Sequence, residues 1–81
     1  MMDKFLMQHK RHMMFKTLRY WSDLMEDYAK QGNINLVNYY EGMISGSVDT
    51  MHSLGAITLQ TLFNLNHLLE EKKGIYKKYY Y

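Results

Sequence analysis

The chain has 81 residues, a net charge of +2, and neither cysteine nor proline. This length allows a single domain with a marginal core, and the lack of cysteine excludes disulfides and thiolate-held zinc, so helix packing or self-association must supply the remaining stability. No apolar run approaches the ~20 residues of a membrane span, and the N-terminus has no signal-peptide pattern, so we expect a cytoplasmic protein that does not contact a membrane.

The first expected element is a long amphipathic helix over residues 4–31. Asp3 is placed to cap it, and Gly32 supplies a left-handed stop. Every charged residue from Lys4 to Arg19 is basic, whereas the acids follow later in the helix. Apolar residues recur at spacings of three, four and seven, which places them on one face: Met7, Met14, Leu18, Trp21, Met25 and Tyr28.

A second helix is expected over residues 35–54, with Asn33 or Asn35 as its N-cap. Gly42 and Gly46 border its apolar face, although a glycine inside a helix costs roughly 1 kcal/mol relative to alanine. Two interpretations remain open: another helix backbone approaches closely there, or the helix is exposed and tolerates the glycines. We favour close packing, because the glycines lie beside the apolar face. That inward face comprises Leu36, Val37, Tyr40, Met43, Ile44, Ser47, Val48, Met51 and Leu54.

The third helix is expected over residues 59–73. Gly55 ends the preceding helix, Thr58 caps this one, and Gly74 is its expected stop. Leucines and a phenylalanine cover more than half of its circumference, which predicts that it is the centre of the fold. The tail, residues 74–81, has no helical period and interleaves tyrosines with lysines. Its aromatics could stack on bases or dock on a protein, but a loosely packed terminus is the more usual outcome.

These elements predict an all-α, three-helix bundle, in which a long N-terminal helix packs on an antiparallel hairpin of two helices. At 1.5 Å per residue the helices are roughly 40, 29 and 22 Å long, so the shorter two can cover only about residues 13–31 of the first. Arg11 lies in the middle of the apolar stripe, which agrees with a core that ends before it. The basic N-terminal third should therefore project.

A projecting helix that is basic and rich in methionine must be covered by a second subunit or by another molecule. We therefore expect a homodimer or a protein partner. The expected oligomer interface comprises Met7, Met14, Gly42 and Gly46. The expected partner-binding residues are Phe5, Met7, His9, Lys10, Arg11, His12, Lys16 and Arg19.

Catalytic and cofactor chemistry is not indicated. His9 and His12 are one turn apart, but a metal site needs further ligands, so a solvated pair is expected and no metal or cofactor is predicted. The chain contains no phosphate loop, dinucleotide fingerprint or acyl-transfer constellation, and we expect that it is not an enzyme. Residues 58–63 could open the second helix of a helix-turn-helix, but they contain no arginine or lysine to contact DNA.

Residues 38–46 (NYYEGMISG) and 54–58 (LGAIT) resemble small orphan proteins of phages and prophages of low-GC Gram-positive bacteria. In those proteins a helix with an aromatic pair, an acid and a glycine leads through a short turn to a capped closing helix. The resemblance covers about the middle third of the chain. It implies a stoichiometric binder that redirects or blocks a host machine, such as a CRISPR nuclease, a replication factor or a transcription factor.

The sequence therefore predicts a non-catalytic accessory protein that binds and modulates or inhibits a host protein in the host cytoplasm, as an anti-CRISPR-like inhibitor does. The alternative is a small dimeric nucleic-acid-binding protein that uses the basic face of the first helix, where His9, His12, Lys16 and Arg19 form one stripe.

Overall fold

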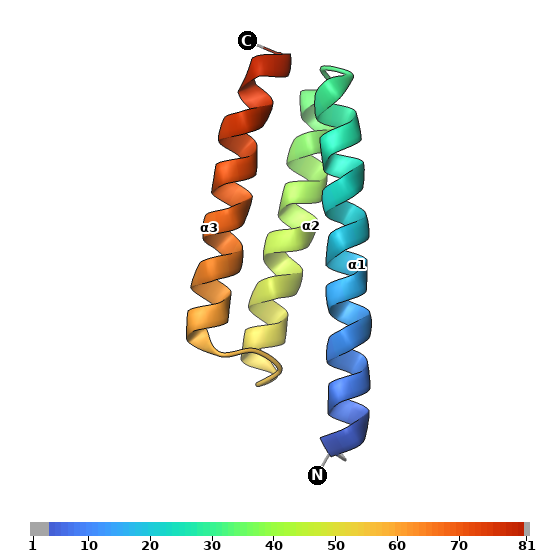
Figure 1. The fold of residues 1–81 in the computed structure, drawn as a ribbon, viewed down its shortest axis with the longest axis vertical. Helices are drawn as coiled ribbons and strands as arrows, with labels where there is room; N and C mark the ends of the chain where they lie inside the picture. The colour runs from blue at the N-terminus through green and yellow to red at the C-terminus, as the bar shows by residue number, and fades with distance from the viewer. Residues whose placement is uncertain (1–3, 81) are drawn as a thin grey trace.

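The structure, a computed structural model, describes the backbone of residues 4–80 and the side chains of residues 8–80. It contains the helices α1 (Lys4–Lys30), α2 (Ile34–Ser53) and α3 (Leu59–Tyr76), followed by the short 3-10 helix η1 (Lys77–Tyr79). The helices run side by side in alternating directions (Figure 1), which confirms the all-α, three-helix prediction. Among the described residues, no helix has the length and apolar character that a membrane crossing requires.

Both interhelical turns use the residues that the sequence indicated. Gly32 and Gly55 adopt positive φ angles of 72° and 77°, the left-handed conformation that ends a helix at little cost for glycine. Asn33, rather than Asn35, caps α2, because its side chain accepts a hydrogen bond from the Leu36 amide at 3.2 Å. Thr58 caps α3 by accepting from the Thr61 amide at 3.2 Å. The predicted cap Asp3 lies outside the described residues.

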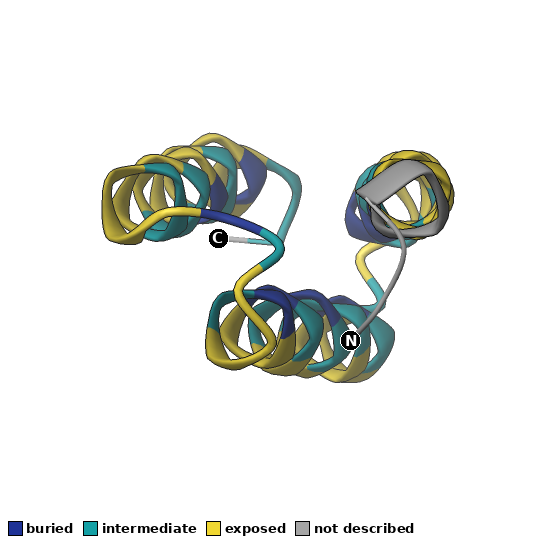
Figure 2. Cartoon of the chain, turned by 90° about the horizontal axis from the view of Figure 1, so that it is seen from below, coloured by how far each residue is buried: buried dark blue, intermediate teal, exposed yellow. Residues whose placement is uncertain are grey.

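The core lies mainly between α1 and α2, which make the most extensive interhelical contact. Met25 and Ala29 of α1 are fully buried, and so are Val37, Val48 and Met51 of α2. The buried residues face the middle of the bundle, with the three helices at the corners of a triangle (Figure 2). Within the predicted apolar stripe of α1, Leu18 and Met25 are buried and Met14, Trp21 and Tyr28 are half-buried. A fully buried methionine or valine contributes about 1.5–3 kcal/mol, so this contact supplies much of the stability.

The prediction that α3 is the centre of the fold is wrong. Its Leu59, Phe63 and Leu68 side chains are 51%, 59% and 51% exposed. The reason is that α1 and α2 bury their apolar faces mainly against each other, so α3 packs with one side of its circumference only. The remaining apolar side chains of α3 face solvent in this chain.

The predicted close approach at the glycines of α2 is also wrong within the chain. Gly42 and Gly46 are exposed, and a Cβ atom at either position would have no neighbouring atom within 4 Å. Leu54, expected on the inward face, is 65% exposed because α2 ends at Ser53 and Leu54 already belongs to the turn. Nothing within the chain explains why α2 carries two glycines.

The C-terminal end differs most from the prediction. Gly74 does not stop α3, which continues to Tyr76. Tyr76 lies seven residues after Leu69, on the same helix face, and is only 3% exposed. Tyr79 and Tyr80 also pack against the core cluster, and the C-terminal end of the described chain lies at the end of the bundle where α1 turns into α2 (Figure 1). Burial of these aromatic rings outweighs the roughly 1 kcal/mol that glycine costs in a helix.

The burial pattern predicts how two methionines of α1 respond to truncation. Met25→Ala should lower the free energy of unfolding by about 2–5 kcal/mol, because it leaves a cavity at a fully buried site. Met13→Ala, at a site that is 47% exposed, should change it by less than about 0.5 kcal/mol. Urea unfolding followed by circular dichroism measures both. Equal losses in the two variants would contradict the proposed core.

Candidate functional site

The N-terminal part of α1 extends beyond the hairpin of α2 and α3 (Figure 1). Every described side chain from residue 8 to residue 13 is exposed, and Met14 is the first to be half-buried. We call residues 8–13 the arm. Its helix continues that of the core without a break. The hairpin therefore begins to cover α1 at Met14, which agrees with the boundary near residue 13 that the difference in helix lengths predicted.

The arm and the two turns after it are strongly basic. Of the predicted partner-binding residues, the side chains of Phe5 and Met7 lie outside the described residues. The other six are all exposed: His9, Lys10, Arg11, His12, Lys16 and Arg19. The structure thus brings these six onto one exposed stretch of helix, although not onto a single narrow face.

Arg11, which interrupts the apolar stripe, contacts an aromatic ring. Its guanidinium carbon lies 5.6 Å from the centroid of the Phe15 ring, within the range of a cation–π interaction. The apolar stem of Arg11 can lie along the helix while its charge stays in water. This arrangement lets a charged residue occupy the stripe position where the core ends.

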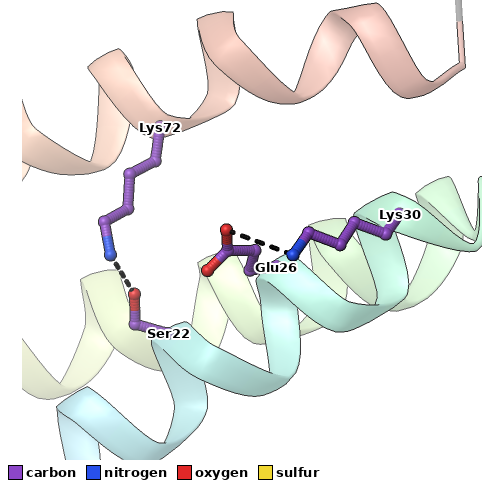
Figure 3. Close-up of polar contacts among 4 residues, drawn as sticks. All are labelled: Ser22, Glu26, Lys30 and Lys72. Carbon is purple, nitrogen blue, oxygen red and sulfur yellow. Dashed lines mark hydrogen bonds and ion pairs between the residues drawn. The ribbon is translucent and has the colours of Figure 1, made fainter.

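The exposed charge of α1 changes sign along its length. Its N-terminal half is basic, whereas Asp23 and Asp27 in the next turns are exposed acids. Glu26 pairs with Lys30 at 3.8 Å on the same helix (Figure 3). No acid lies among residues 8–19, so the cations of this stretch have no opposite charge beside them on their own part of the helix.

A groove of about 410 Å³ lies between α1 and α3, with α2 at its floor. Its apolar lining includes Phe15, Leu18, Ile44, Val48, Leu65, Leu68 and Leu69. Lys72 of α3 reaches across one end and donates a hydrogen bond to the Ser22 hydroxyl of α1 (Figure 3). Arg19 and Asp23 complete the polar lining. No sequence pattern indicates this groove, because it arises where α1 and α3 make little contact with each other.

The residues predicted to form an oligomer interface do not share one surface. Met14 packs against the core cluster, whereas Gly42 and Gly46 are exposed on α2. The side chain of Met7 lies outside the described residues. Oligomerisation through these residues stays a prediction.

The described residues contain no group of three or more metal-ligating side chains. His9 and His12 are both exposed. The other two histidines differ from them in setting: His67 lies 3.0 Å from Glu71 on α3, and His52 is half-buried near the end of α2.

The C-terminal aromatics have a structural role in this chain. Burial, together with the nearby carboxylates of Glu26 and Asp23, raises the pKa of Tyr76 to about 12. Burial also raises the pKa of Tyr40, which stacks on Tyr28 with 5.7 Å between ring centroids. These phenols therefore stay neutral and act as core side chains.

An ion pair fixes α3 on α2. The Lys73 ammonium lies 3.0 Å from the Glu41 carboxylate, and this hydrogen-bonded pair raises the pKa of Lys73. Lys73 also lies 3.9 Å from Glu70. Two of the four tail-region lysines, Lys72 and Lys73, thus hold α3 in place, while Lys77 and Lys78 remain exposed.

No protein family, curated protein or solved structure matches this chain.

The environment of Tyr76 predicts a loss of stability at high pH. A pKa raised from about 10 in the unfolded chain to about 12 in the fold means that Tyr76 stabilises fully below pH 10 and that this contribution is lost as the pH rises from 10 to 12. Tyr76→Phe should lose less stability over that range than the native protein. Urea unfolding at stepped pH values tests this, and parallel losses in both proteins would refute it.

Proposed function

We propose that this protein is a non-catalytic accessory protein that binds a host protein in the cytoplasm and modulates or inhibits it, in the manner of an anti-CRISPR-like inhibitor. The arm and the adjacent Lys16 and Arg19 contact an acidic surface of that partner. The observation that carries the proposal is the arm itself: a basic, exposed helix end that extends beyond the hairpin.

The electrostatics of α1 support an acidic partner. The arm places Lys10 and Arg11 side by side in a stretch, residues 8–19, that contains no acid, so neighbouring cations repel one another in the isolated chain. An acidic partner surface would relieve that repulsion and would also steer association. Methionine and aromatic side chains beside the cations would supply adaptable apolar contacts.

A protein partner is favoured over nucleic acid by the length of the basic stretch. From His9 to Arg19 it spans roughly 15 Å of helix. Exposed Asp23 and Asp27 follow on α1, where they would repel a phosphate backbone that continued along the helix. A compact acidic patch on a protein fits this pattern of charge better than an extended polyanion.

The resemblance of residues 38–46 and 54–58 to small phage and prophage proteins supports the class of action. Those proteins act by binding a host component in fixed stoichiometry. The described helical hairpin α2–α3 is compatible with the hairpin of that pattern, and the arm adds a feature outside the resemblance.

The proposal predicts that charge reversal in the arm abolishes capture of the partner. Lys10→Glu combined with Arg11→Glu should lose capture from a lysate of the host cell, because both side chains are exposed and their charge is the recognition element. The matched control is Lys77→Glu with Lys78→Glu, which alters the net charge equally at exposed positions of the opposite end. Affinity capture with mass spectrometry compares the three proteins.

Nuclease treatment of the lysate separates the two candidate partners. Capture by the native and control proteins that survives nuclease, together with loss in the arm variant, supports the proposal. Equal capture by the arm variant contradicts it. If capture disappears with nuclease, and fluorescence anisotropy shows binding to a generic duplex that weakens steeply with salt, the protein is a nucleic-acid binder instead.

A further inference from the structure

The groove between α1 and α3 is bordered by an exposed apolar face of α3. Leu68 lines the groove and is 51% exposed, and Ile75, seven residues later on the same face, is 56% exposed. Glu71 lies between them in sequence and is also exposed. This face, which we call the α3 outer face, therefore combines two aliphatic side chains with one acid.

The opposite wall of the groove has the complementary character. Phe15 of α1 contributes a half-buried ring to the lining, and Arg19, one turn later, contributes a cation; the acid of this wall, Asp23, lies a further turn along α1. Lys16, one residue after Phe15, is exposed beside it. At the level of Phe15 the groove thus combines an apolar floor with a cationic edge, which suits an occupant that has aliphatic side chains and an acid on one helix face.

We propose that the occupant is a second copy of this chain, with the α3 outer face of each copy seated over the groove of the other. A single chain carries both halves of the interface: the apolar, acidic helix face and the apolar, cationic groove. Because the two halves adjoin at Leu68, one two-fold axis near this residue satisfies both at once. That is the isologous arrangement expected of a small symmetric dimer.

Across this two-fold axis the α3 helices of the two copies run antiparallel, and this orientation determines which residues meet. Leu68 of each copy lies near the axis, where it covers the groove floor. Glu71 then lies on the α1 side of the other copy, at the level of Phe15, within reach of Lys16 and Arg19. Ile75 extends the apolar contact toward the N-terminal end of that groove. The interface has an apolar centre with charge pairs at its edge.

The rest of α3 offers no such complementarity. Phe63 is 59% exposed but does not line the groove, and by helical periodicity it lies well away from Leu68 around the helix. This makes it a matched internal control. The dimer shares Lys16 and Arg19 with the proposed partner-binding surface but uses no residue of the arm, so Leu68→Glu tests the dimer and Lys10→Glu with Arg11→Glu tests the proposed function separately.

Sedimentation equilibrium of the full chain tests the proposal with one disruptive and one control variant. The native protein should be a dimer at micromolar concentration. Leu68→Glu should raise the dimer dissociation constant by about a hundredfold or more, because it places a carboxylate in an apolar contact. Phe63→Glu should leave the constant within about threefold of the native value, a shift of less than 1 kcal/mol.

Charge exchange supplies a second readout that a folding defect cannot imitate. Glu71→Arg alone and Lys16→Glu with Arg19→Glu should each weaken the dimer, and the three changes together should restore it. A native protein that stays monomeric at micromolar concentration, a dimer that survives Leu68→Glu, or equal weakening by Phe63→Glu would each overturn the proposal. A monomer would leave the groove to a helix of another protein.

Discussion

The packing of α1 against α2 is the constraint on which the other features depend. Met25, Ala29, Val37, Val48 and Met51 are at most 1% exposed, and all five belong to these two helices. The left-handed conformation of Gly32 turns the chain sharply enough for α2 to return along α1. Near this turn Tyr28 stacks on Tyr40, which fixes the register of the pair. Because α1 has 27 residues and α2 has 20, this register leaves the described side chains of residues 8–13 exposed at the N-terminal end of α1.

The second consequence is the open contact between α1 and α3. The apolar faces of α1 and α2 pack mainly against each other. The contacts that hold α3 are its buried Leu69 and Tyr76, the Lys73–Glu41 ion pair and the Lys72–Ser22 hydrogen bond. A partly exposed ion pair of this kind contributes only about 1 kcal/mol. The apolar groove and the exposed aliphatic side chains of α3 follow from this limited contact, and both are available for association.

The sequence was informative where a local signal and the hydrophobic pattern agreed. The spacing of Met14, Leu18, Met25 and Tyr28 identified the buried face of α1, and Gly32 and Thr58 marked real helix ends. The arm followed from helix lengths alone. In each case the feature depends on local backbone geometry or on the spacing of apolar residues along one helix.

Prediction failed where tertiary packing overrode a local signal. Gly74 indicates a helix end, but burial of Tyr76 stabilises the continuation of α3 to that residue. The apolar circumference of α3 indicated a central helix, yet apolar composition does not reveal whether the neighbours lie in the same chain. Gly42 and Gly46 indicated a close contact that this chain does not make. The groove was unpredictable, because it depends on the separation of α1 from α3, which no short-range pattern encodes.

Hydrogen exchange of the backbone amides tests the central claim most directly, since it compares the arm with the supported part of the same helix. Amides of residues 21–29, which lie in the part of α1 that packs against α2, should exchange only through global unfolding. Those of residues 9–13 should exchange through local fraying with a much smaller opening free energy. Arm amides that are protected as strongly as those of Met25 and Ala29 in the isolated protein would contradict the account.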